Sequence, residues 1–415
     1  MSKDNEKGWQ EYLDNSIPGY SRRVNLNKIK NTQENNMKSI LFGITSLTLG
    51  GAERVLVDIA NRLSDKFDIT IFTIYGNGEL EKQLSDKVKL KTLNEKSYSE
   101  LSSMQKKLVM PLKMLFSKKK IYNENIKNNY DIEIAFLEGP ITRLFSIENK
   151  NKKENIKTRK IAWVHNDISL VFGKGIKSKI KRILDKKTYK KYEKLIFVSK
   201  DNMQKFEEFY PEIKTKKEVI YNYIDKEIIL KKAQEELEID KQIEFKKDKI
   251  NFISVARLTK QKGIDRIIKM HKQLIEEGLQ HNFYVIGDGP EKGNLEKLII
   301  KENIQNTFHL LGKKENPYPL IKQANYFCLL SHFEGYGMVL EEAKILQKNI
   351  IITDTAAREA VSKYENSQIV KNSENGIYEG LKKAISQNEN LNKNVIKQEY
   401  NNENILNQII KLMEG

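Results

Sequence analysis

The stretch Met37–Leu63, MKSILFGITSLTLGGAERVLVDIANRL, contains the pattern that indicates the fold of this chain. Its first part, Ser39–Ile44, is a short apolar run typical of a buried β-strand. A glycine-containing loop follows, and after it apolar side chains recur with the spacing of one helical stripe, at Val55, Leu56, Ile59, Ala60 and Leu63. A strand, a loop and a helix in this order predict an α/β protein.

Short apolar runs continue to alternate with helical or polar stretches along the chain. In the first half they read DITIFTI, YDIEIAFL, KIAWVH and KLIFVS, and in the second half KINFISVARL, HNFYVIGDG, TFHLLG, NYFCLLS and NIIITD. This alternation favours parallel sheets that are covered on both faces. A charged stretch, KEIILKKAQEELEIDKQIEFKKDK, separates the two series. We therefore expect two Rossmann-like halves that place a ligand in the cleft between them.

Length and composition are those of a folded protein. The 415 residues correspond to about two to three domains, and 39% hydrophobic content suffices for real cores. Residues 1–36 show no periodic apolar pattern and are interpreted as a flexible extension. The polar N-terminus and the absence of an apolar run of about 18 residues predict a cytoplasmic protein. The single cysteine, Cys328, excludes an internal disulfide and a thiolate metal cage, and we expect it to be buried.

The net charge of +17 is concentrated in two lysine-rich stretches of the first half. Gln105–Lys127 holds seven lysines against one acid, and Lys174–Lys194 holds ten basic residues against two acids. In the second stretch, isoleucines at helical spacing predict a basic amphipathic helix, a membrane-surface signature. An ordinary solvated helix accounts for the same pattern equally well. Nucleic acid is the other polyanion to consider, but no groove-reading module or interleaving of aromatic and basic residues is visible.

Two glutamates flank a glycine-containing turn in SHFEGYGMVLEEAKIL. Gly335 and Gly337 would bend the chain sharply between a strand and a helix that begins near Tyr336 or Gly337. The free N–H groups of that helix would suit a phosphate. Because carboxylates repel phosphate, Glu334 and Glu342 would instead accept hydrogen bonds from sugar hydroxyls. A capping glutamate followed by a solvated one is the simpler alternative.

A cation pair lies in the same half, in SVARLTKQKGIDRII. Arg257 ends a predicted strand, and Lys262 lies five residues later. Two such cations at the carboxyl end of a strand can neutralise a diphosphate. Together with GDGPE and GGAER, the pair makes a simple surface cluster an insufficient explanation.

From Met37 onward the chain resembles retaining GT-B glycosyltransferases of the GT4 type, which include bacterial capsule and surface-polysaccharide transferases. Glu334 and Glu342 match the paired glutamates of that family at its seven-residue separation, and Arg257 and Lys262 match its diphosphate-binding pair. LGGAER matches its glycine-rich first loop, and IAWVHND resembles the segment with its active-site histidine, here His165. The five matches occur in the family's order.

The resemblance implies two Rossmann-like domains that face each other across a cleft. Residues 37–222 would bind the acceptor, with a C-terminal helix at about 396–415 packing back on them, and residues 223–395 would bind the nucleotide-sugar. Glu334 and His165 would act at the donor sugar, and Glu342 would bind the ribose. The diphosphate would lie among the remaining donor-binding residues, which are Gly50, Gly51, Arg257, Lys262, Gly335, Tyr336, Gly337, Met338 and Val339.

The implied reaction moves a hexose or N-acetylhexosamine, expected from a UDP-sugar, to a lipid-linked or cell-surface glycan with retention of configuration. No cofactor and no metal is expected, since cations and N–H groups can stabilise the leaving diphosphate and no D-x-D occurs in the chain. A basic acceptor half and a lipid-linked acceptor predict a peripheral protein at the anionic inner face of the cell membrane, without nucleic acid as a partner.

Two departures from the family pattern concern the donor side. Gln347, Lys348 and Asn349 replace a frequent Gly-x-Pro, and Ala356 and Ala357 replace a usual Gly-Gly. The alternatives that stay open are a UDP-sugar epimerase of the same architecture and a non-catalytic relative that binds sugar nucleotides. The sequence does not give the donor sugar, the acceptor, the linkage or the oligomeric state.

Overall fold

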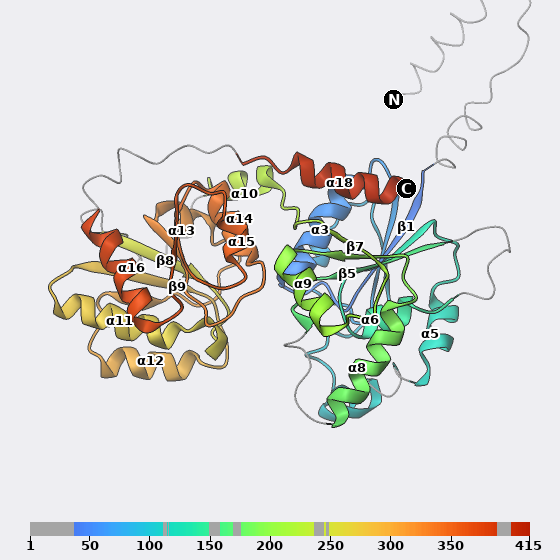
Figure 1. Cartoon of the computed structure of the whole chain (residues 1–415), viewed down its shortest axis with the longest axis horizontal. Coiled ribbons are helices and arrows are strands. Elements are labelled where there is room, and N and C mark those ends of the chain that lie inside the picture. Colours follow the sequence, from blue (N-terminus) through green and yellow to red (C-terminus); the bar gives the residue numbers. More distant parts are fainter. Residues whose placement is uncertain are drawn as a thin grey trace, which may run out of the picture. The chain divides into compact units, whose positions relative to one another are not determined.

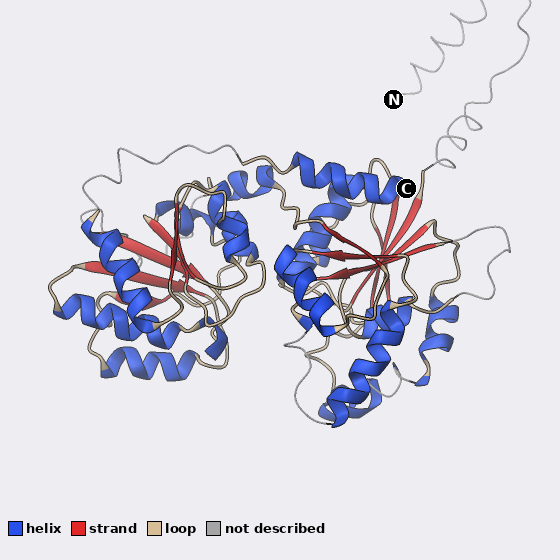
Figure 2. Ribbon diagram, in the orientation of Figure 1, coloured by secondary structure: helices blue, strands red, loops and turns tan. Residues whose placement is uncertain are grey.

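The computed structural model contains two parallel β-sheets with helices on their faces (Figures 1 and 2). It describes residues 37–110, 114, 116–148, 158–168, 176–235, 245, 249–387 and 400–415. The predicted flexible extension, residues 1–36, lies outside these ranges. The α/β class predicted from the alternating pattern is confirmed.

The first sheet has seven parallel strands in the order β3-β2-β1-β4-β5-β6-β7. Their bounds are β1 Ser39–Ile44, β2 Asp68–Thr73, β3 Lys89–Thr92, β4 Ile132–Ala135, β5 Arg159–Val164, β6 Lys194–Phe197 and β7 Lys216–Val219. The helical segments are α3 Gly51–Leu63, η1 Glu81–Gln83, η2 Gln105–Val109, α5 Lys118–Asn125, α6 Pro140–Phe145, α8 Ile176–Tyr189 and α9 Lys200–Phe209.

Alternate side chains of a strand enter opposite cores of this sheet. On β1, Ile40 and Phe42 belong to the core that also contains the apolar stripe of α3, whereas Leu41 belongs to the core that contains α6. Both faces of the strand are therefore buried, which explains why it is a continuous apolar run.

The second sheet has six parallel strands in the order β10-β9-β8-β11-β12-β13. They are β8 Ile250–Val255, β9 His281–Ile286, β10 Phe308–Leu310, β11 Tyr326–Leu329, β12 Asn349–Thr353 and β13 Ser367–Val370. Helical segments around it are α10 Lys226–Lys232, η3 Lys260–Lys262, α11 Ile264–Glu276, α12 Lys292–Lys301, α13 Tyr318–Gln323, α14 Met338–Ile345, α15 Arg358–Val361 and α16 Glu374–Ser386. Cys328 on β11 is fully buried, as predicted.

Each sheet reverses its strand order next to its first strand. In the first sheet this happens between β1 and β4, and in the second between β8 and β11. Crevices at such switch points, outside the carboxyl ends of the strands, are where open parallel sheets bind ligands. The topology therefore indicates that a ligand would contact the loops that follow these four strands.

The last helix of the chain, α18 Glu403–Glu414, packs against the first half (Figure 1). Ile409, Leu412 and Met413 lie in the core shared with α3. Arg159 on β5 donates from Nη1 to the carbonyl of Leu412 at 3.0 Å. The chain thus returns to its first sheet after completing the second.

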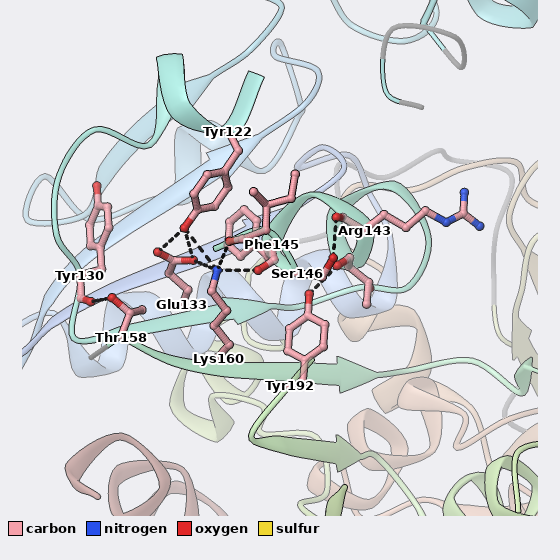
Figure 3. Close-up of polar contacts among 11 residues, drawn as sticks. Tyr122, Tyr130, Glu133, Arg143, Phe145, Ser146, Thr158, Lys160 and Tyr192 are labelled. Atoms are coloured by element: carbon pink, nitrogen blue, oxygen red, sulfur yellow. Dashed lines mark hydrogen bonds and ion pairs between the residues drawn. The ribbon is translucent and has the colours of Figure 1, made fainter. Parts of the chain in front are cut away.

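A buried polar cluster supports the first sheet on the side of α5 and α6 (Figure 3). The ammonium group of Lys160 lies 2.7 Å from the Glu133 carboxylate and also donates to the carbonyls of Phe145 and Ile147. The Tyr122 hydroxyl donates to both carboxylate oxygens at 2.8 Å. Since the charges are paired and hydrogen-bonded within the fold, we assign this cluster a structural role.

Candidate functional site

The residues predicted to bind the donor lie at the switch point of the second sheet. Arg257 follows β8, Lys262 ends η3 in the same loop, and Glu334 follows the neighbouring strand β11. The carboxyl ends of these two parallel strands are adjacent, so residues some 70 positions apart in sequence meet at one edge.

Lys262 and Glu334 form an ion pair at this edge. The Lys262 ammonium group donates to Oε2 of Glu334, and the Ser331 hydroxyl donates to the same oxygen at 3.2 Å. Only 18% of the Lys262 side chain and 13% of the Glu334 side chain are exposed. The residue predicted to bind the diphosphate is therefore in direct contact with the residue predicted to bind the sugar.

The turn between Glu334 and α14 requires glycine at one position. Gly337 has a φ of 72° and precedes the first residue of α14, Met338. A Cβ there would also lie 3.1 Å from the Leu329 side chain. Gly337 has no side chain to cap α14, so the free N–H groups of the first turn of this helix suit an anion.

A hydrogen-bond network ties the two loops of the switch point together. Gln261 accepts from the backbone N–H of His332 at 2.8 Å and donates to the carbonyl of Phe333 at 3.0 Å. Beneath it, Arg266 is 4% exposed and donates to the carbonyl of Leu330 and to Asn372. The loops that carry Lys262 and Glu334 are thus held as one unit.

Glu342 and Glu341, adjacent in sequence, have different surroundings. The Tyr318 hydroxyl donates to Glu342 at 3.1 Å, and burial raises the pKa of the Glu342 carboxyl, an effect opposed by the positive charge of Arg54. Glu341 accepts instead from Tyr336 and Lys344, is only 4% exposed, and is structural. The carboxylate available to a ligand is that of Glu342.

In the first half, His165 follows β5 and has an unusual environment. Burial lowers the pKa of its imidazole to about 3, so the ring is neutral at physiological pH. Its Nε2 atom is buried and has no hydrogen-bond partner in the described part of the chain. The ring centroid lies 4.7 Å from that of Phe136 and is stacked on Trp163.

All of the predicted site residues line one cavity of about 1140 Å³. From the first half it contains Gly50 and Gly51, at the start of α3, and His165. From the second half it contains the remaining predicted residues, namely Arg257, Lys262, Glu334, Gly335, Tyr336, Gly337, Met338, Val339 and Glu342. The fold brings these residues together, while the role of each stays a prediction.

Two residues that act on Glu342, Tyr318 and Arg54, were not predicted from the sequence. Tyr318 begins α13 and Arg54 lies on α3, and the Arg54 guanidinium lies 5.7 Å from the centre of the Tyr318 ring. GGAER was noted for its glycines, but no spacing in the sequence connects its arginine with a helix some 260 residues later.

The departures from the family pattern have defined places. Gln347 adopts a φ of 54°, the left-handed conformation that glycine would occupy at lower cost. Ala356 lines the cavity, whereas Ala357 is buried in the core of the second half. Among the residues that the structure describes, no group of three or more His, Cys, Asp or Glu side chains is placed to hold a metal ion.

The chain is similar in sequence to known glycosyltransferases. Residues 235–413 match the family model described as Glycosyl transferases group 1. The chain is 27% identical to a Campylobacter jejuni N-acetylgalactosamine-N,N'-diacetylbacillosaminyl-diphospho-undecaprenol 4-alpha-N-acetylgalactosaminyltransferase, over 84% of this chain and 90% of the relative. It is 28% identical to an uncharacterized glycosyltransferase of Methanocaldococcus jannaschii over 71% and 70% of the two chains.

The fold has close counterparts among solved structures. Anabaena HepE, crystallised in complex with UDP, superposes with a TM-score of 0.66 at 17% identity, over 91% of this chain and all of that one. A similarity at this identity shows a shared fold.

Proposed function

We propose that this chain is a glycosyltransferase, because residues 235–413 match the family model of glycosyl transferases group 1 and the chain has the GT-B fold. It moves a hexose or N-acetylhexosamine from a UDP-sugar to a lipid-linked glycan, with retention of configuration. The product would be a precursor of a surface polysaccharide. No metal ion is needed in this proposal.

The Lys262–Glu334 pair carries the proposal. A cation that neutralises phosphate and a carboxylate that accepts from sugar hydroxyls lie in contact beside the uncapped start of α14. A nucleotide-sugar presents a diphosphate joined directly to a sugar, so one ligand would satisfy both groups. Neither an isolated phosphate nor a free sugar matches this combination as well.

The proposed roles of the site residues follow from the place where negative charge develops during the reaction. As the bond between the sugar and the diphosphate breaks, negative charge grows on the leaving diphosphate. Arg257, Lys262 and the N–H groups of α14 would stabilise that charge, and removal of one such interaction typically costs about 10²-fold or more in rate. Glu334 would hold the sugar, and the neutral His165 would lie at its other side, able to accept or donate one hydrogen bond through Nε2.

The nucleoside end is assigned to Glu342. Its carboxylate, already fixed by Tyr318, would accept hydrogen bonds from the ribose hydroxyls. The UDP bound in Anabaena HepE supports uracil as the base.

The acceptor and the membrane are proposed together. The name of the Campylobacter relative specifies a diphospho-undecaprenol acceptor, which is a lipid. Both lysine-rich stretches expose large apolar side chains, with Phe116 78% and Ile183 53% exposed. Such residues among lysines fit the interface of an anionic leaflet. In the described part of the chain, no helix is long and apolar enough to cross a membrane.

A panel of nucleotide-sugars tests the proposal. Binding and slow hydrolysis should be found with a UDP-sugar, and transfer to a lipid diphosphate-linked acceptor should give a product whose anomeric configuration, measured by NMR coupling, equals that of the donor. Absence of binding across UDP-, GDP- and ADP-sugars would refute it. Epimer formation without acceptor would favour the epimerase alternative, and binding without any turnover the non-catalytic one.

A further inference from the structure

Glu138 lies at the switch point of the first sheet and holds the loop that begins with His165. It follows β4, which is paired with β5, the strand that ends next to His165. One carboxylate oxygen of Glu138 accepts from the backbone N–H groups of His165 and of Asn166, the latter at 2.6 Å. The other oxygen accepts from the Asn166 side-chain amide at 3.1 Å. Three donors of one short loop therefore converge on one side chain.

The backbone around Glu138 is itself constrained. Gly139 has a φ of 91°, which favours glycine, and Pro140 begins α6 immediately afterwards. The Thr142 hydroxyl donates to the carbonyl of Leu137 at 2.7 Å. The backbone is thus fixed on both sides of Glu138. The Glu138 carboxylate therefore has a defined position next to the His165–Asn166 loop.

This carboxylate holds the backbone from which the His165 ring projects. The imidazole contacts the rings of Phe136 and Trp163, and the backbone N–H of His165 donates to Glu138, so the ring and the backbone are both restrained. Glu138 itself does not line the cavity that His165, Asn166 and Leu137 line. Its influence on a ligand would therefore pass through the loop.

We propose that Glu138 is a positioning residue for sugar transfer, which fixes the His165–Asn166 loop so that the free Nε2 atom of His165 meets the donor sugar. The inference rests on the proposed function. Loss of the carboxylate would leave the nucleotide-binding half intact while allowing the histidine to move. A displacement of about 1 Å in such a group can lower a rate by about 10²-fold.

Variants of Glu138 separate this role from a structural one. Glu138→Gln keeps the size but turns an amide toward Asn166, and Glu138→Ala removes every acceptor. We expect kcat to fall by about 10-fold for the first and about 10²-fold for the second, with unchanged UDP affinity. Glu100→Gln is the matched control, because Glu100 also accepts from a backbone N–H, that of Ser97, and from an asparagine, Asn77, at a site outside the cavity.

A double-mutant cycle tests whether the effect of Glu138 on kcat passes through His165. If Glu138 acts through the histidine, Glu138→Gln should lower kcat in the wild-type background and cause no further loss in the His165→Ala background. Equal losses in both backgrounds would overturn the proposal, because Glu138 would then act by another route.

NMR provides a readout that needs no activity. The amide protons of His165 and Asn166 should shift upfield in Glu138→Gln, since hydrogen bonds to a carboxylate are stronger than those to an amide. Unshifted amides in the variant would refute the contact itself. An inactive wild-type protein would refute the proposed function, whereas an active wild type with unchanged kcat in both Glu138 variants would refute this inference alone.

Discussion

Lys262 and Glu334 are paired at the carboxyl edge of the second sheet, although 71 residues separate them in the sequence. Each neutralises the charge of the other, and both side chains are mostly shielded from water. We infer that a nucleotide-sugar exchanges this internal pair for two external ones, diphosphate on Lys262 and sugar hydroxyls on Glu334. Removal of one partner of a buried pair also destabilises the fold, so variants of this pair need a stability measurement beside the kinetic one.

Arg257 offers the cleaner test of the diphosphate site. Arg257→Ala should lower kcat/KM by about 10²-fold or more, because one electrostatic contact to a leaving group contributes about 3 kcal/mol. Lys262→Ala should show a similar kinetic loss. Lys260→Ala is the matched control, since Lys260 belongs to the same loop and does not line the cavity. Wild-type kcat/KM in folded Arg257→Ala would contradict the assignment.

The two glutamates should not be equivalent. Glu342→Gln should weaken binding of UDP itself, because the ribose contact is present in UDP. Glu334→Gln should leave UDP affinity unchanged and lower the rate of sugar transfer. Isothermal titration calorimetry with UDP, together with steady-state kinetics, distinguishes the two, and the opposite pattern would mean that the roles are exchanged.

Activity should be insensitive to chelation. The proposed stabilisation of the diphosphate uses Arg257, Lys262 and backbone N–H groups, so EDTA should leave kcat unchanged. The measurement is a transfer assay after dialysis against EDTA, with and without added Mg²⁺ or Mn²⁺. Loss of activity that Mn²⁺ restores would show that the reaction depends on a metal.

Binding to anionic vesicles should depend on lysines of the first half. The structure narrows the choice of residues, because Arg182 donates to the Phe209 carbonyl and Lys186 pairs with Glu212. The exposed Lys119, Lys187 and Lys190 are better targets. Changing these three to Gln should weaken co-sedimentation by about 10²-fold, at about 1 kcal/mol for each lysine, and salt should weaken it further.

The control for this experiment has the same change in net charge. Exposed lysines of the second half, Lys297, Lys301 and Lys383, are changed to Gln and should leave vesicle binding unaffected. Equal pelleting with neutral and anionic vesicles, or equal losses in the two triple variants, would remove the proposed membrane surface.

Stability should fall in mild acid because of buried histidines, which are His165 and a pair in the second half, His271 and His281. Burial lowers the pKa of His281 to about 4 and lowers that of His271 well below its usual value. Their rings lie 4.3 Å apart and are fully buried. In the unfolded chain a histidine has a pKa of about 6.5, so the unfolded state binds more protons below that pH. Stability is therefore fully present above about pH 6.5 and is lost as the pH falls.

Each histidine should remove about 1.4 kcal/mol from the free energy of unfolding per pH unit below about 6.5. Urea unfolding between pH 7.5 and 5 measures this slope. His281→Gln should reduce the slope, whereas the exposed His332→Gln should not alter this buried contribution. A slope that is unchanged in His281→Gln would contradict the account.

Ten of the strands were predictable from the sequence, nine of them because they lie inside their sheets with both faces largely buried, and the edge strand β10 because it lies in the apolar run TFHLLG. Runs such as Ser39–Ile44 and Asn349–Thr353 are largely apolar. Such a run can be recognised as a strand without knowing which strands lie beside it in the sheet. The strands β3, β7 and β13 were not predicted. Each lies at an edge of its sheet and is rich in polar, partly exposed residues, so its composition resembles that of a loop.

The convergence of the candidate residues on one cavity was also predictable, because they follow strands within short motifs and the strand ends of a parallel sheet meet at one edge. Their partners were not. The contacts of Lys262 with Glu334, of Tyr318 with Glu342, and of Glu138 with the His165 loop depend on the order of the strands, which crossover connections decide. The sequence by itself determined which chemical groups the protein has at its strand ends, whereas only the tertiary structure decided which of them meet, because hydrogen bonds and ion pairs act over a few ångströms of space and not along the chain.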